Sequence, residues 1–310
     1  MNYINDVREI VGHTPIIKLN NLGINENVNI FAKLENLNPG GSVKDRVGLY
    51  IIDGAEKRGE LKKGATIISA TAGNTGIGIA LAAINKGYKI IFTVPTKFSE
   101  EKQQLMRALG AQIINTPREQ GMLGAVKKAE ELKETIKGSV IINQFENKDN
   151  PRAHYEGTGK EIYEDLDGKI DYFTAGAGSG ATYSGIMKYF KKKNKNIRGV
   201  LADPIGSTMG GGEEAPYNIE GIGNDFIPGT MDMNLVDDVI KVTDDEAFKA
   251  AKLLASKEGI IVGSSSGAAL VSALKIAEKI ESGNIVTVFP DNGDRYLSKG
   301  IYNYVDSAIN

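Results

Sequence analysis

Lys44 stands in a setting that could make a lysine side chain reactive. It follows Pro39, Gly40 and Gly41, which form a sharp turn where backbone can approach a ligand closely, and Ser42, a good helix N-cap. Apolar residues with helical spacing come next, so Lys44 is predicted in the first helical turn. The positive end of the helix dipole disfavours a cation there. The neutral amine could attack a carbonyl and form a Schiff base; a solvated surface lysine is the alternative.

A second stretch, residues 69–76, lies between a predicted strand and a buried helix. Backbone N–H groups at the start of that helix suit an anion of the size of a carboxylate. Asn74 could also reach an aromatic hydroxyl group. Gln144, at the end of another predicted strand, could place an amide donor over the same carboxylate. Taken alone, an ordinary capped turn and a plain strand end explain these two stretches as well.

A third stretch, Gly176 to Thr182, is rich in glycine and again joins a strand to a helix. Its exposed N–H groups and the hydroxyl of Ser179 suit a phosphate group. It is not a Walker loop, because no Gly-Lys-Ser/Thr follows. A dinucleotide fingerprint is the alternative, with Asp203 as the ribose acid, although Ala181 occupies the place of the last glycine.

A fourth stretch, Gly263 to Gly267, contains three serines at one more junction of a strand and a helix. A serine hydroxyl here, such as that of Ser265, could pair with a ring nitrogen without forcing the ring to be charged. N-capping of the following helix is the simpler explanation for the stretch taken alone.

These four stretches need elements that hold them together, and short β-rich runs alternate with helical patterns through most of the chain. Such alternation predicts an α/β protein with parallel sheets covered by helices, where ligands lie at the carboxyl ends of strands. Thr243 and Glu246 form a predicted capping box. Residues 205–228 are predicted to be a mobile loop over a site. Strands are predicted at 30–32, 66–68, 90–94, 112–114, 140–142, 172–174, 199–201, 260–262 and 285–289, and helices at 76–84, 99–110, 122–137, 152–165, 182–192 and 268–280.

Composition excludes several classes of function. The 310 residues can bury a large core and form two lobes. A net charge of −2 gives no reason to expect nucleic acid or an anionic membrane as partner. The absence of cysteine excludes disulfides, thiolate metal sites and cysteine nucleophiles, and fits a reducing cytoplasm. With two histidines, His13 and His154, a histidine-based zinc site is not expected. The first nine residues do not resemble a signal peptide, and no run is long enough to span a membrane.

Taken in order, these motifs resemble the cysteine synthase (O-acetylserine sulfhydrylase) and cystathionine β-synthase family of fold-type II pyridoxal phosphate (PLP) enzymes. The resemblance runs from the Gly-His-Thr-Pro at residues 12–15 to the Asp-Arg-Tyr at 294–296. It implies a homodimer with a smaller lobe, about residues 46–149, that closes on substrate, and a larger lobe of residues 1–45 and 150–310.

The resemblance also implies roles for individual residues. Lys44 matches the Schiff-base lysine, and Ser265 matches the serine on the pyridine nitrogen. Asn74 is placed to touch the ring hydroxyl. The cofactor phosphate is then held by Gly178, Ser179, Gly180, Ala181 and Thr182, and the substrate carboxylate region by Thr71, Ala72, Gly73, Thr75, Gln144 and Gly221.

The chemistry that the resemblance implies is replacement or elimination at the β-carbon of an amino acid. PLP acts as an electron sink. An amino-acid substrate displaces Lys44, which then serves as base on Cα. The β-substituent leaves to give an aminoacrylate, and a nucleophile adds at Cβ. Pairing the ring nitrogen with the neutral Ser265 favours this β-chemistry over transamination.

Departures from the cysteine synthase pattern bear on the substrate. Ala72 replaces a serine, and Asn224 and Asp225 replace small residues. Bisulfide needs no base, whereas attack by water does, and a serine hydroxyl needs an acid to leave. Asp225 or Asp232 is therefore hypothesised to be a general acid or base over Cβ, although both could be solvated or cap turns. Three stretches resemble cystathionine β-synthases more than cysteine synthases: residues 202–204, 220–228 and 290–291.

The predicted function is thus a PLP-dependent reaction on β-substituted L-alanines such as cysteine, O-acetyl-L-serine and serine, forming or releasing hydrogen sulfide. Conversion of cysteine and water into serine and hydrogen sulfide is one form of it, and cystathionine-type thioether synthesis is another. A nucleotide-dependent oxidoreductase that uses residues 176–180 is an alternative from a different class, and a catalytically silent binding module is a third. Small molecules are the expected partners, and no metal is expected.

Overall fold

The computed structural model describes residues 1, 3–71, 73–96 and 98–303. Two compact units divide the chain: an N-terminal unit of Met1–Val11 and Asn38–Asn150, and a C-terminal unit of Gly12–Leu37 and Pro151–Asn310. Of residues 1–45, which were expected in the larger lobe, residues 1–11 and 38–45 cluster with the N-terminal unit. Residues Lys44–Lys57 form one helix, α1, that packs inside that unit. Within the described ranges, no helix is long and apolar enough to cross a membrane.

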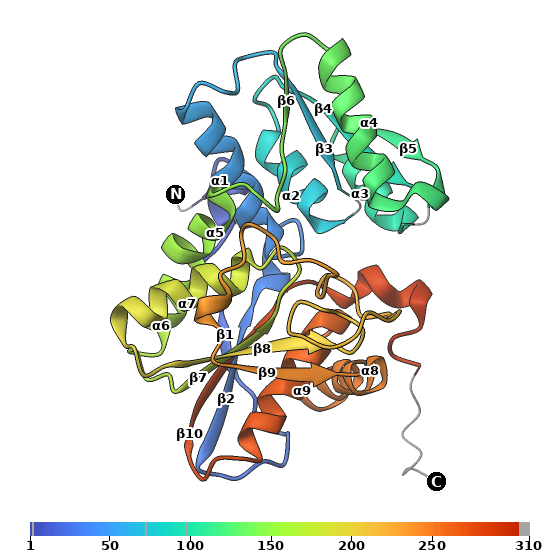
Figure 1. The fold of residues 1–310 in the computed structure, drawn as a ribbon. Coiled ribbons are helices and arrows are strands. Elements are labelled where there is room, and N and C mark those ends of the chain that lie inside the picture. Colours follow the sequence, from blue (N-terminus) through green and yellow to red (C-terminus); the bar gives the residue numbers. More distant parts are fainter. Residues whose placement is uncertain (2, 72, 97, 304–310) are drawn as a thin grey trace. The chain divides into compact units, whose positions relative to one another are not determined.

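The N-terminal unit is built on a sheet of four parallel strands in the order β5-β4-β3-β6 (Figure 1). Its strands are β3 (Thr66–Ala70), β4 (Lys89–Pro95), β5 (Gln112–Thr116) and β6 (Ser139–Ile141). Its helices are α1, α2 (Asn74–Ala83), α3 (Glu100–Ala108) and α4 (Gly121–Thr135), with short 3-10 turns at Val7–Ile10 and Arg118–Gln120.

Strand alternation places helices on both faces of this sheet. Ile67 and Phe92 point into a core shared with α1 and α2. Their neighbours Ile68 and Ile91 point the other way, against Ala129 of α4. Successive side chains of a strand face opposite sides, so the runs of apolar residues in β3 and β4 supply both cores.

The C-terminal unit contains a second sheet, in the order β1-β2-β10-β7-β8-β9, in which β1 is antiparallel to β2 and the other pairs are parallel. The strands are β1 (Ile16–Lys18), β2 (Val28–Leu34), β7 (Tyr172–Gly176), β8 (Arg198–Pro204), β9 (Asp238–Val242) and β10 (Gly283–Phe289). The α-helices are α6 (Gly159–Asp165), α7 (Ala181–Lys193), α8 (Asp244–Leu253) and α9 (Ser264–Ala277). Helix α5 (Asp149–Ala153) joins the two units; π-helical turns lie at His154–Thr158 and Leu254–Glu258, and 3-10 turns at Glu35–Leu37, Met233–Leu235 and Gly293–Lys299.

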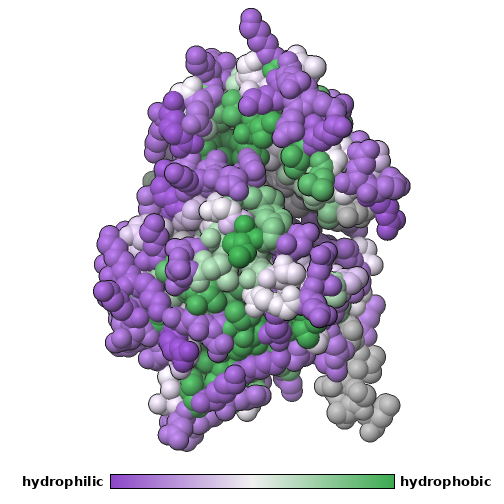
Figure 2. Space-filling view, in the orientation of Figure 1, coloured by the Kyte–Doolittle hydropathy of each residue, from purple (hydrophilic) through white to green (hydrophobic). Residues whose placement is uncertain are grey.

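Alternation along β10 again supplies two cores. Ile285 and Phe289 pack with α8 and α9, whereas Val286 and Val288 pack with α6 and α7. The surface over α6 is hydrophilic (Figure 2), as its Lys, Glu and Asp residues require. The α/β class with mostly parallel sheets and the capping box of Thr243 are confirmed.

One predicted strand is absent and two strands were not predicted. Residues 260–262 form only an isolated bridge between Val262 and Asn292, and Ile261 is 54% exposed. The apolar run there is the connection that leads into α9 and is not part of a sheet. The short strand β1 and the edge strand β9 carry weak patterns and were missed. Residues 205–228 contain neither helix nor strand.

Candidate active site

Lys44 is the first residue of α1, as its spacing predicted. The N-cap position is Val43 rather than Ser42, but the Ser42 hydroxyl still accepts a hydrogen bond from the Lys44 N–H at 3.2 Å. The buried carboxylate of Asp45 accepts one from the Gly40 N–H at 2.5 Å. A Cβ on Gly40 would lie 2.5 Å from Asp45 Oδ1, so a larger residue at that position would displace the Asp45 carboxylate.

The start of α2 forms the predicted carboxylate loop. Asn74 is its first residue and Gly73 its N-cap. A Cβ on Gly76 would lie 2.3 Å from the Met106 sulfur and 3.0 Å from a methyl of the buried Thr71, so a larger residue there would displace these side chains. Ala72 lies outside the described residues.

Gln144 is joined to this loop by a side-chain hydrogen bond. The Thr75 hydroxyl donates to Gln144 Oε1 at 2.5 Å, and the Gln144 carbonyl accepts from Asn150 Nδ2 at 2.7 Å. With its oxygen engaged by Thr75, the amide of Gln144 has its N–H groups available for an anion. The structure therefore brings together these two residues of the predicted substrate site.

Helices α1 and α2 touch at the backbone. A Cβ on Gly48 would lie 2.0 Å from the Gly78 carbonyl oxygen, and a Cβ on Gly78 would lie 2.1 Å from that of Lys44. Two glycines thus allow the start of α1, which carries Lys44, to lie against the second turn of α2.

In the C-terminal unit, the glycine turn (residues 176–182) connects β7 to α7. Gly180 has a φ of 77°, in the left-handed region that favours glycine, and α7 begins at Ala181. A Cβ on Gly178 would lie 2.4 Å from the Gly221 carbonyl oxygen, so Gly221 lies against the turn. The turn therefore combines glycines with a helix N-terminus, the arrangement that binds phosphate groups.

His154 is a residue that sequence reasoning did not connect with this turn. Its fully buried ring lies with Nε2 3.2 Å from the Thr182 hydroxyl and Nδ1 3.0 Å from that of Thr158. Because Thr182 and His154 are 28 positions apart, no local pattern could reveal their contact. His154 lies in a π-helical turn, and such turns recur at functional sites.

Ser265 lies in the first turn of α9 and is 4% exposed. The N-cap is Gly263, without a side-chain cap bond, so the serines do not cap this helix. Ser264 instead accepts from the Glu220 N–H at 3.1 Å. Nearby, the buried Tyr296 hydroxyl donates to Asp291 Oδ2 at 2.5 Å. Burial and the adjacent Asp291 carboxylate raise the pKa of Tyr296 well above its ordinary value.

The two hypothesised acid–base residues are both exposed. Asp232 caps the 3-10 turn Met233–Leu235, since its Oδ1 accepts from the backbone and side-chain nitrogens of Asn234 at 3.1 and 3.0 Å. Asp203 is 1% exposed, and its Oδ2 accepts from Lys241 Nζ at 2.5 Å and from the Gly210 N–H at 3.0 Å. Because its carboxylate is buried and paired with Lys241, Asp203 is unsuited to act as the ribose acid of a dinucleotide site.

Two groups of residues in the C-terminal unit fit a phosphorylated ring. The N–H groups of Gly178 and Gly180 donate to no other residue in the part of the chain that the structure describes, and the same holds for the Ser265 hydroxyl. The two glycine N–H groups could donate to a phosphate at the turn, and the Ser265 hydroxyl to a ring nitrogen. This pair of features fits the class of pyridoxal phosphate enzymes.

Comparisons with known proteins agree with that class. The family model described as "Pyridoxal-phosphate dependent enzyme" matches residues 7–291. An O-acetylserine dependent cystathionine beta-synthase of Bacillus subtilis is 51% identical over 97% of this chain and 99% of its own. A cysteine synthase of Helicobacter pylori is 49% identical, over 97% and 100%. The crystal structure of a hydrogen sulfide-producing enzyme from Fusobacterium nucleatum has 40% identity and a TM-score of 0.91, over 95% and 100%.

The chain therefore belongs to the pyridoxal phosphate-dependent enzymes and, within them, to the cysteine synthase family. Its cofactor is pyridoxal phosphate, and its fold is that of the fold-type II enzymes. The comparisons do not favour a nucleotide-dependent oxidoreductase, in agreement with the buried ion pair of Asp203.

Proposed function

We propose that this enzyme replaces or eliminates the β-substituent of L-alanine derivatives such as cysteine, O-acetyl-L-serine and serine. Hydrogen sulfide is the product when it leaves cysteine, and a reactant when it replaces the acetate of O-acetyl-L-serine or the hydroxyl of serine. Full-length relatives named for cystathionine and cysteine synthesis, and a structural neighbour named for hydrogen sulfide production, support this proposal. With homocysteine as the nucleophile, the product would be the thioether cystathionine, which appears in the name of the Bacillus subtilis relative.

The observation that carries the proposal is the backbone contact between α1 and α2. It fixes the position of Lys44 relative to the N-terminus of α2 within one unit. In an amino-acid substrate, the carboxylate is bonded to Cα, the carbon that must lose a proton. The two therefore lie a short distance apart. A helix N-terminus suits the carboxylate, and a lysine on the neighbouring helix suits the proton transfer.

In this proposal, each residue of the candidate active site has a defined role. Lys44 would hold the cofactor through its side-chain amine and would move a proton at the substrate Cα. Residues 71–75 and the amide of Gln144 hold the substrate carboxylate. Asn74 would bind the ring hydroxyl of the cofactor, and Ser265 would bind its ring nitrogen without adding charge. When bound, pyridoxal phosphate supplies the electron sink that stabilises negative charge at Cα.

Asp225 or Asp232 is proposed to activate water as the nucleophile, or to protonate a departing hydroxyl. Asp232 uses one carboxylate oxygen to cap its turn, and its second oxygen makes no bond to another residue within the described ranges. Replacing each with Asn should lower sulfide release from cysteine about 10-fold or more in at least one variant. Asp238→Asn, an exposed site in β9, is the matched control. Unchanged rates in both variants would remove the acid–base role.

Product analysis tests the function itself. O-acetylserine, serine and cysteine are each incubated with the enzyme, with and without sulfide or homocysteine. Borohydride reduction followed by peptide mass spectrometry should place the cofactor on Lys44. A cofactor on another lysine, or no conversion of any of the three amino acids, would contradict the proposal.

We also propose that the enzyme is a cytoplasmic homodimer whose segment 46–149 moves on substrate binding. Light scattering measures the mass in solution, and cell fractionation gives the location. Hydrogen exchange with and without substrate should change within residues 46–149 if that segment moves.

A further inference from the structure

Three successive carbonyl oxygens of the glycine turn accept hydrogen bonds from one side. The donors are in or just after the irregular segment (residues 205–228). The bonds are Gly223 N–H to Ala177 O at 2.8 Å, Asn224 Nδ2 to Gly178 O at 2.5 Å, and Thr230 Oγ1 to Ser179 O at 2.6 Å. The carbonyl side of the turn is therefore fully engaged by the protein.

The direction of these carbonyls decides the direction of the N–H groups. In a trans peptide the N–H points away from the C=O of the same peptide unit, and the described chain contains no cis peptide. Carbonyls 177–179 facing the irregular segment therefore turn the N–H groups of residues 178–180 to the opposite side. Of these, the N–H groups of Gly178 and Gly180 donate to no other residue in the described ranges, and beside a helix N-terminus they form a site for an anion.

Asn224 is itself held on both sides. Its N–H donates to the Ser207 hydroxyl and its carbonyl accepts from the Thr208 N–H, at 3.1 and 2.9 Å. The Ser207 carbonyl in turn accepts from Lys241 Nζ at 2.7 Å, and this is the lysine paired with the buried Asp203. A chain of polar contacts thus runs from strands β8 and β9 to the Gly178 carbonyl, which makes Asn224 a fixed donor.

We infer that Asn224, together with Thr230, is a positioning residue for the cofactor phosphate: the two side chains hold the carbonyls of the glycine turn, so that its N–H groups face the phosphate. The inference rests on the proposed placement of the phosphate at this turn. It gives a structural task to the Asn224 side chain, at a position where cysteine synthases of the usual pattern have a small residue. By linkage, phosphate binding must in turn stabilise the contacts of Asn224 and Thr230 with the turn.

The test compares a ligand with and without phosphate. Apoenzyme is titrated with pyridoxal 5'-phosphate and with pyridoxal, and the 31P resonance of the bound phosphate is recorded. Asn224→Ala and Thr230→Val each remove one side-chain donor and leave the backbone bonds. Each should weaken pyridoxal phosphate binding about 3- to 10-fold, as expected for one hydrogen bond, and shift the 31P resonance, while pyridoxal binding stays within about twofold of wild type.

Asn218→Ala is the matched control. Asn218 lies in the same irregular segment, but its side chain donates to Asp244, away from the glycine turn. It should leave both affinities unchanged. If Asn224→Ala does not fold, Thr230→Val decides, because valine keeps the shape of this buried threonine.

Two results would overturn the inference: pyridoxal phosphate affinities of both variants within twofold of wild type, or an equal loss of affinity for pyridoxal. Failure of the proposed active site is a separate result. It would appear in the wild-type enzyme as borohydride trapping of the cofactor away from Lys44, whatever the two variants do.

Discussion

Thr75 and Gln144 are 69 positions apart, yet the hydroxyl of one donates to the side-chain oxygen of the other at 2.5 Å. Thr75 lies in the first turn of α2, which follows β3, and Gln144 follows β6. Strands β3 and β6 are neighbours in one sheet. The bond fixes the orientation of the Gln144 amide, with its oxygen toward Thr75.

The first prediction concerns this bond. Thr75→Val keeps the shape of the side chain but removes the donor, so the Gln144 amide can rotate. We expect the KM for the amino-acid substrate to rise about 10-fold, while cofactor absorbance stays unchanged. Thr75→Ser should restore most of the loss. A KM equal to wild type in the valine variant would show that the bond does not orient Gln144.

The second prediction concerns the contact between α1 and α2. Gly48→Ala places a methyl group 2.0 Å from the Gly78 carbonyl oxygen, so the helices must separate. We expect a loss of about 1–3 kcal/mol in the free energy of unfolding and a larger proportional loss in kcat, because Lys44 moves with α1. Urea denaturation and steady-state kinetics measure the two effects. The exposed Lys57→Ala in the same helix is the control; full activity in Gly48→Ala would contradict the prediction.

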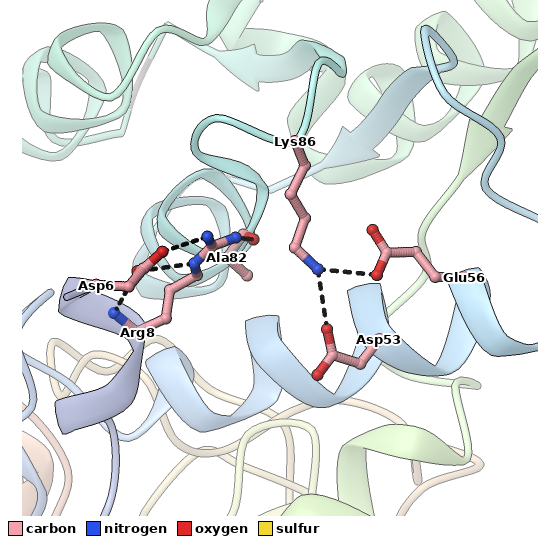
Figure 3. Close-up of polar contacts among 6 residues, drawn as sticks. All are labelled: Asp6, Arg8, Asp53, Glu56, Ala82 and Lys86. Atoms are coloured by element: carbon pink, nitrogen blue, oxygen red, sulfur yellow. Dashed lines mark hydrogen bonds and ion pairs between the residues drawn. The ribbon is translucent and has the colours of Figure 1, made fainter.

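The third prediction concerns a cluster of charges on the N-terminal unit. Lys86 donates to Asp53 Oδ1 at 3.1 Å and Glu56 Oε2 at 2.8 Å on α1, and Arg8 contacts the Ala82 carbonyl at 3.4 Å (Figure 3). Burial alone would raise the pKa of Glu56, but its bonds with Lys86 and Tyr88 outweigh burial and lower it below the ordinary 4.5.

The sign of the pH dependence follows from that lowered pKa. Glu56 stabilises the folded state above its unfolded-state pKa, and this contribution is lost as the pH falls through the folded-state pKa. Glu56→Gln should therefore cost about 0.5–1 kcal/mol near pH 7 and nothing in strong acid. Thermal melts from pH 7 down to pH 3 measure it, with exposed Glu130→Gln as control. A stability difference that does not shrink toward pH 3 would argue against the ion pair.

The fourth prediction concerns the pair Tyr296 and Asp291, each 2% exposed. Tyr296→Phe removes one donor to a buried carboxylate, which should cost about 1–3 kcal/mol. Tyr302→Phe is the matched comparison, because its hydroxyl donates to the Val262 carbonyl at 2.6 Å and is half-buried. Tyr302→Phe should lower the stability, and therefore the Tm, less than Tyr296→Phe does. Equal losses would mean that the carboxylate adds nothing.

Much of the architecture was predictable because each pattern acts over a short stretch of chain. The alternation of β-rich runs with helical runs gave the α/β class, and the helix starts at Lys44 and Thr243 were marked by nearby residues. The glycine turn was marked by composition, because left-handed backbone and close approach both require glycine. Residues 260–262 were misassigned because an apolar run has no strand partner until the fold provides one.

What the sequence by itself determined is the type of chemistry: a lysine at a helix start, two turns suited to anions, and a serine at a third junction. Tertiary structure decided which groups hold those residues in place. The bonds of Thr75 to Gln144, Thr182 to His154, and Asn224 to Gly178 join residues 69, 28 and 46 positions apart. A hydrogen bond depends on distance in space, and only the folded sheets and helices determine which distant residues lie close enough to form one.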